Sequence, residues 1–123
     1  MIEIVDLYGG LMSLPPYGGE LESGYIVNII TIGSDLYFTL STYRNPFGVV
    51  ISTSDETGLV YVACSLFIFK TDIFEEDQCY KKGDLLYSNN YGIFTTRKVR
   101  DDAIPIGIVN IDRTGRYIEC RLI

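Results

Sequence analysis

The chain has 123 residues, of which 47% are hydrophobic, with 16 acidic and 10 basic side chains and a formal net charge of −6. This length predicts one domain, and the apolar fraction is ample for a core. The acidic balance argues against nucleic-acid binding, which needs a basic surface to displace counterions from phosphates. The sequence contains no histidine, so the commonest general base and metal ligand is missing.

No segment reaches the roughly 18 to 20 apolar residues of a membrane helix. The longest apolar run, 59–69, suits buried strands. The N-terminus lacks a basic region and a cleavage motif, so we expect no signal peptide. Cys64, Cys79 and Cys120 are widely spaced and form no zinc motif. We expect reduced and mostly buried thiols.

Residues 1–24 differ in composition from the rest. Residues 1–8 alternate loosely and could form a short strand, but two Gly-Gly pairs and Pro15-Pro16 interrupt regular structure after them. The stretch is nevertheless apolar for a free linker, so it should lie on its own domain or on a neighbour. The sequence therefore predicts an extended N-terminal arm, 1–24, and a β domain, 25–123.

The β domain is predicted from short β-branched and aromatic runs separated by turn residues. No segment has a sustained helical period, and a single helical turn is expected only within 72–80, with Asp72 as its cap. The polar segment 53–58 predicts a hairpin. The pattern favours an all-β fold, a compact β-barrel or sandwich. The expected strands are 25–32, 36–40, 47–52, 59–64, 66–71, 84–87, 93–96, 105–111 and 116–122.

An internal repeat supports two similar strand-turn-strand lobes. Residues 45–50 resemble 104–109, and each is followed by a polar turn ending in Thr-Gly and then by a strand reaching a cysteine. The copies are 59 residues apart at Pro46 and Pro105. In each, a glycine two residues after the proline would allow a strand to bend or to approach another backbone closely. We expect repeat units 25–71 and 80–123, although two hairpins can also look alike by chance.

No catalytic constellation is evident. The sequence has no nucleophile elbow or phosphate-binding loop, and its acidic clusters lack calcium-binding spacing. We therefore expect no enzyme activity, no cofactor and no metal, and a function that resides in surfaces. Tyrosines beside turns suit protein contacts or the ends of a barrel. These are Tyr8, Tyr17, Tyr25, Tyr43, Tyr80, Tyr91 and Tyr117.

Charge is unevenly distributed along the chain. Residues 1–43, 44–79 and 80–123 carry −5, −4 and +3. An acidic front and a basic back could attract each other across a subunit contact, or each could be a solvated face.

The C-terminal third carries a resemblance. Its pattern K-G-D-x-L-Y-x-x-x-x-G-x-x-T from Lys82, x-P-I-G-I-V at 104–109 and a closing strand at 115–122 resemble small β domains of tailed-bacteriophage structural proteins. Head decoration (cement) proteins, head fibres and some tail-fibre modules share this sequence pattern. The resemblance implies a virion protein, made in the host cytoplasm, that binds the major capsid protein and copies of itself as a homo-trimer or homo-dimer. It implies no nucleic-acid and no membrane partner.

If the resemblance holds, the apolar arm is the natural strap across a neighbouring subunit. Exposed tyrosine and the basic C-terminal part complete the predicted contact surface. Its residues are Leu11, Met12, Leu14, Pro15, Pro16, Tyr17, Tyr91, Arg97, Lys98 and Arg100. A tail, fibre or baseplate module that binds a receptor or carbohydrate is the alternative, and a small cellular ligand-binding barrel or enzyme is a third reading.

Overall fold

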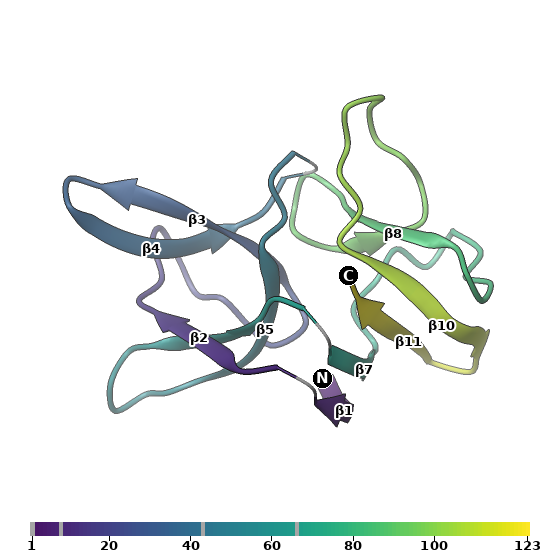
Figure 1. The fold of residues 1–123 in the computed structure, drawn as a ribbon, viewed down its shortest axis with the longest axis horizontal. Coiled ribbons are helices and arrows are strands. Elements are labelled where there is room, and N and C mark those ends of the chain that lie inside the picture. The colour runs from purple at the N-terminus through teal and green to yellow at the C-terminus, as the bar shows by residue number, and fades with distance from the viewer. Residues whose placement is uncertain (1, 8, 43, 66) are drawn as a thin grey trace.

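The computed structural model describes residues 2–7, 9–42, 44–65 and 67–123, and within them the fold is all-β. Two antiparallel sheets lie side by side (Figure 1). The predicted fold class is therefore confirmed. The strands are β1 (Ile2–Leu7), β2 (Leu11–Leu14), β3 (Ile26–Ile32), β4 (Asp35–Leu40), β5 (Gly48–Thr53), β6 (Val60–Ala63), β7 (Phe67–Thr71), β8 (Leu85–Ser88), β9 (Phe94–Thr95), β10 (Gly107–Thr114) and β11 (Tyr117–Leu122).

The two sheets have the same strand order. One runs β2-β6-β5-β3-β4, and the other runs β7-β11-β10-β8-β9 with β1 added beside β7. Adding five to each strand number of the first sheet gives the strand order of the second sheet without β1. We call residues 11–64 the first lobe and residues 67–122 the second lobe. Each unit thus begins one strand earlier than the expected units 25–71 and 80–123, because β2 and β7 each pair with the last strand of their own lobe.

Turn and bulge positions repeat as well. Each lobe's long hairpin has a register shift after the same position, at Val50 in the first lobe and at Val109 in the second. Backbone hydrogen bonds between equivalent residues have equal lengths. Phe47 N–H donates to Val27 O and Ile106 N–H to Leu86 O at 2.8 Å, and Gly24 N–H donates to Val50 O and Gly83 N–H to Val109 O at 2.9 Å.

The repeated glycines explain why the two hairpins are alike. A Cβ atom on Gly48 would lie 2.4 Å from the Ala63 carbonyl oxygen, and one on Gly107 would lie 2.8 Å from that of Arg121. Both distances are too short for any side chain, so the predicted close approach of backbones occurs at both positions.

Each lobe also closes its curled sheet in the same way. In the first lobe Pro16 forms a parallel bridge with Phe38, and in the second Phe74 forms one with Phe94. The segment after the first strand therefore runs extended along the opposite sheet edge. This explains why 72–80 forms turns and no helix: Glu75 N–H donates to Phe94 O at 2.9 Å, which fixes an extended path.

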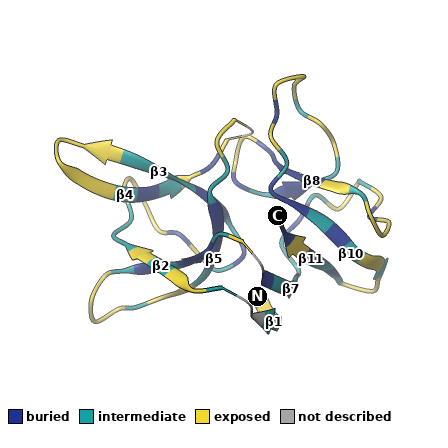
Figure 2. Cartoon of the chain, viewed as in Figure 1, coloured by how far each residue is buried: buried dark blue, intermediate teal, exposed yellow. Residues whose placement is uncertain are grey.

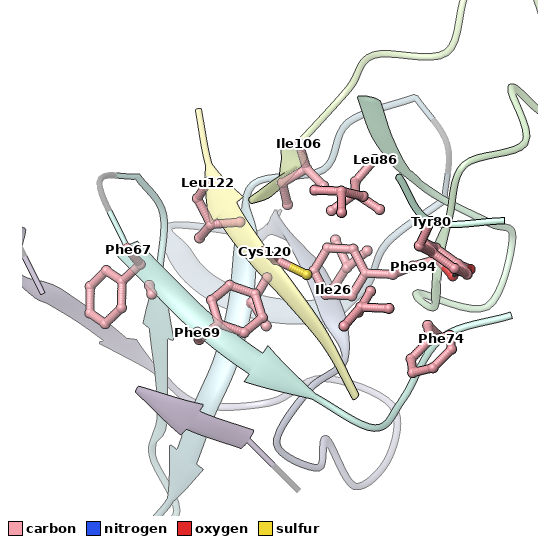
Figure 3. Close-up of a cluster of buried hydrophobic side chains, with 14 residues drawn as sticks. Ile26, Phe67, Phe69, Phe74, Tyr80, Leu86, Phe94, Ile106, Cys120 and Leu122 are labelled. Carbon is pink, nitrogen blue, oxygen red and sulfur yellow. Dashed lines mark hydrogen bonds between the residues drawn. The ribbon is translucent and has the colours of Figure 1, made fainter. Parts of the chain in front are cut away.

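Two apolar clusters form the core, and one of them joins the lobes. The first-lobe interior is smaller and includes Val27, Phe38 and Val62. The second-lobe interior is dominated by phenylalanines (Figure 3), and three residues from the outer sheet face of the first lobe complete it. These are Ile26, Val49 and Ala63, all fully buried. One lobe therefore covers the open interior of the other, and the two cannot separate without exposing this core.

Candidate partner-contact site

The predicted arm is built into both sheets. β1 pairs with β7, and β2 pairs with β6 from Leu11 opposite Ala63 to Leu14 opposite Val60. Met12 and Leu14 pack against the first-lobe core, whereas the Leu11 side chain is exposed. The arm thus lies on its own domain, and its alternating pattern produced a strand where the sequence predicted irregular structure.

Pro15, Pro16 and Tyr17 form the seam that closes the first lobe. Phe38 N–H donates to Pro15 O at 3.0 Å, and Tyr17 N–H donates to Phe38 O at 2.8 Å. Pro16 lacks an N–H group and lies between these two bonds. The Tyr17 ring stands half-exposed and edge-on to Tyr37, with centroids 5.7 Å apart. Of the six arm residues in the predicted contact surface, only Leu11 and Tyr17 are exposed; the other four are half-buried.

The hairpin of β3 and β4 projects away from the rest of the chain (Figure 1). Its tip is exposed (Figure 2), with Ile32 and Leu36 beside the turn, and Leu40 is exposed near the base of the hairpin. A hairpin with so much exposed apolar surface is typical of a segment that a partner covers. The sequence predicted both strands but gave no sign of this exposure, since β-branched runs normally indicate burial.

Tyr91 has the most exposed aromatic side chain of the described residues, at 72%. A rigid turn holds it: the Asn89 side-chain oxygen accepts hydrogen bonds from Tyr91 N–H (2.8 Å) and Ile93 N–H (3.0 Å). Ile26 N–H of the first lobe donates to Gly92 O at 2.7 Å. Tyr91 therefore stands at the junction between the lobes.

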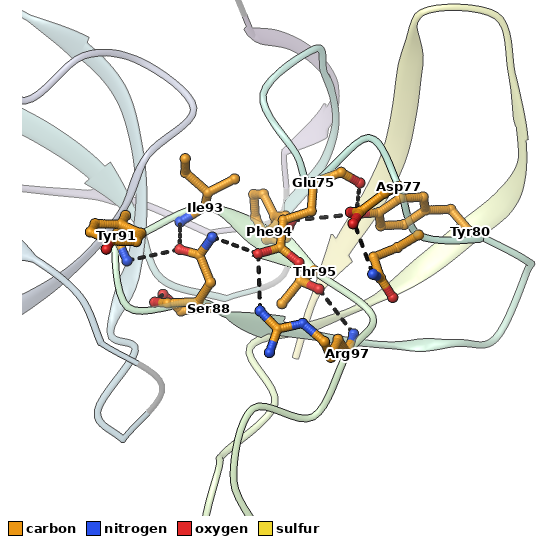
Figure 4. A network of polar contacts seen from close by, with 11 residues as sticks. Glu75, Asp77, Tyr80, Ser88, Tyr91, Ile93, Phe94, Thr95 and Arg97 are labelled. Atoms are coloured by element: carbon orange, nitrogen blue, oxygen red, sulfur yellow. Dashed lines mark hydrogen bonds and ion pairs between the residues drawn. The ribbon is translucent and has the colours of Figure 1, made fainter.

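A polar network beside this turn centres on Glu75 (Figure 4). The Glu75 carboxylate accepts from the Asn89 amide at 2.8 Å and pairs with the Arg97 guanidinium at 3.2 Å. Burial alone would raise the pKa of Glu75, but hydrogen bonds from Asn89, Thr95 and Arg97 lower it below its ordinary value. Tyr80 O–H donates to Glu75 O at 2.7 Å, and burial raises the pKa of Tyr80 well above its usual range.

The three predicted basic contact residues lie on or beside the connection from β9 to β10. Arg97 is engaged with Glu75, while Lys98 and Arg100 are exposed. The structure thus places the six arm residues on the first lobe and the four others on the second. Divided by lobe, the formal charges are −4 and 0, and β1 adds −2. The charge contrast lies between the lobes, and the second lobe is neutral rather than basic.

A sheet face that the sequence did not single out is the most informative surface. Ile26, Val49 and Ala63, the buried outer face of the first lobe, correspond to Leu85, Ile108 and Arg121 in the second. The equivalent face is largely open there: Leu85 is 45% exposed, Arg121 is also exposed, and Ile108 is half-buried. We call these three residues the outer face of the second lobe.

Other expectations concern single residue types. Tyr80 is buried, Tyr25 and Tyr117 are half-buried, and Tyr8 and Tyr43 lie outside the described residues. Cys120 is buried as expected, and its burial raises the pKa of the thiol. Cys64 is half-buried and Cys79 is exposed, contrary to the expectation for most of the thiols, because Cys79 lies in the turn where the sequence placed a helix.

Within the described ranges, no three side chains of the usual ligand types come together to hold a metal ion. No helix that could cross a membrane occurs in the part of the chain that the structure describes. No known protein-family model matches the chain, and no curated protein sequence matches it.

Proposed function

We propose that this protein is a capsid decoration protein that binds the major capsid protein lattice at the virion surface and stabilises the shell. One observation carries the proposal. The outer face of the second lobe repeats a surface that is fully buried inside this same chain, yet Leu85 and Arg121 are exposed there and Ile108 is only half-buried.

An exposed face of this kind suits a protein contact. Leu85 lies directly opposite Ile108 on the neighbouring strand, and Ile108 lies opposite Arg121. Apolar side chains flanked by an arginine are typical of the energetic centre of an interface. The exposed hairpin of β3 and β4 and the Tyr91 turn extend the surface available for contact.

The mechanism is thermodynamic. A decoration protein that binds the assembled shell and not the free subunits adds its binding free energy to the stability of the shell. Repetition over many equivalent lattice sites adds avidity when the protein self-associates. Dimers or trimers on local symmetry axes would provide this repetition.

The test is cosedimentation of the purified protein with expanded capsids of the phage that encodes it. We expect hundreds of copies per shell, and we expect Leu85→Asp to weaken binding at least tenfold. Ile111→Asp is the matched control, since Ile111 is 44% exposed on a different stretch of β10 and should leave binding unchanged.

A wild-type protein that does not bind the shell would overturn the proposal. Recovery of a few to a few dozen copies, located at the tail by electron microscopy, would favour the tail, fibre or baseplate module instead.

A further inference from the structure

An acidic groove is lined mainly by residues of the first lobe, together with Ile73 of the second. It has a volume of about 610 Å³ and lies between the seam after β2 and the hairpin of β5 and β6. Glu20, Glu22 and Asp55 line it, and no lysine or arginine does. Among the described residues, no ion pair reaches these three carboxylates.

An arginine of the chain itself occupies the equivalent place in the second lobe. The Arg113 guanidinium lies 4.5 Å from the centre of the Phe74 ring and pairs with Glu76 at 2.9 Å. Its Nε–H donates to Gly115 O at 3.1 Å, and its backbone N–H donates to Tyr80 O at 3.0 Å. One guanidinium therefore contacts the seam segment and the hairpin turn at once.

Three residues correspond between the two sites. Phe74, Tyr80 and Gly115, which contact Arg113, are the equivalents of Pro16, Leu21 and Gly58. Those three residues line the groove of the first lobe. The connection from Gly48 to Gly58 is two residues longer than that from Gly107 to Gly115, and polar Ser54 and acidic Asp55 stand where the second lobe supplies its arginine.

We propose that the groove of the first lobe binds an arginine side chain of a partner protein, in the position that Arg113 occupies in the second lobe. A guanidinium can hydrogen-bond to a carboxylate and to carbonyl oxygens at the same time. The lining supplies acidic side chains together with apolar Leu21, Leu59 and Val60 against which the arginine stem can pack. The proposal rests on the proposed function only in assigning the arginine to a protein partner.

The test uses the blocked peptide acetyl-Val-Arg-Val-amide, titrated into the isotopically labelled full chain and followed by NMR. We expect amide shifts at Leu21, Ser54 and Gly58, and none at their counterparts in the second lobe. The citrulline analogue, which keeps the shape and loses the charge, should bind at least tenfold more weakly.

Variants locate the site. Asp55→Asn should weaken binding of the peptide at least fivefold. Asp35 is also an exposed acid, at the tip of the β3–β4 hairpin, and Asp35→Asn should leave the affinity for the peptide unchanged. Arg113→Ala should vacate the equivalent place in the second lobe, and the peptide should then also shift the amide signals of residues there. Equal affinity for arginine and citrulline peptides, or an Asp55→Asn variant that binds as the wild type does, would overturn the proposal.

A further outcome concerns the occupant. Self-association in sedimentation experiments that Asp55→Asn abolishes would identify the partner as a second copy of this chain and would overturn assignment to a different protein. Peptide binding is separable from the capsid test. The groove can bind arginine when shells do not bind the protein, and shells can bind an Asp55→Asn variant.

Discussion

The two lobes share a backbone and differ in which of their surfaces the rest of the chain covers. Strand order, bulge position and key hydrogen bonds coincide. Yet the outer sheet face is buried in the first lobe and open in the second, and the groove is open in the first and filled in the second. Backbone geometry is thus maintained by a few glycines and strand pairings, while the remaining positions are free to specialise.

The largest expected difference is between Ile26 and Leu85, the same position in the two lobes. Ile26→Ala should destabilise the protein by about 3 kcal/mol, because it leaves a cavity in the shared core. Leu85→Ala should cost less than about 0.5 kcal/mol, since Leu85 is an exposed residue. Urea unfolding of both variants measures the difference, and equal costs would contradict the packing of one lobe into the other.

The next comparison concerns the paired glycines. Gly48→Ala and Gly107→Ala should each destabilise by about 2 to 3 kcal/mol, because the added methyl group meets a carbonyl oxygen of the neighbouring strand. Gly48 should be the more sensitive, with the shorter contact of 2.4 Å. Gly19→Ala is the control, since a methyl group there meets nothing within 4 Å. Thermal denaturation ranks the three; a neutral Gly48→Ala variant would break the proposed equivalence.

The smallest effect is a dependence on pH that arises from Glu75 in the second lobe. The pKa of Glu75 is lowered in the folded protein, so its contribution to stability is complete above the ordinary value of 4.5. The contribution is lost as the pH falls through the lower folded pKa. Glu75→Gln should therefore reduce the acid sensitivity of unfolding, by less than about 1 kcal/mol. Urea midpoints measured at pH 3, 4 and 7 would show it, and identical pH profiles for variant and wild type would argue against the network.

Much of the fold was predictable because the strands of this chain are short and are separated by clear turn residues. Thr-Gly turns at 57–58 and 114–115 and the prolines before Gly48 and Gly107 fixed two hairpins in advance. The arm was misjudged for the same reason. Its Gly-Gly and Pro-Pro pairs indicate interruption, and nothing local shows that four residues between them, 11–14, find a partner in β6.

The candidate contact surfaces were less predictable. Leu85 and Ile26 have the same local pattern, so no local rule distinguishes the exposed residue from the buried one. Arg113 and Asp55 likewise stand in similar polar turns, and only the structure shows that Arg113 contacts Phe74 whereas Asp55 lines an open groove.

The sequence by itself determined the strand content, the turns and the repeat, because alternation and the conformational limits of glycine and proline act over a few residues. The tertiary structure alone decided which strand face is covered and which groove is left open. The covered face depends on how one lobe docks against the other, and the filled groove depends on Arg113 reaching Phe74 and Glu76; both join residues that are far apart in the chain. The net charge of −6 is therefore located in the structure: the excess of acidic residues lies on β1 and the first lobe, where an open groove faces solvent.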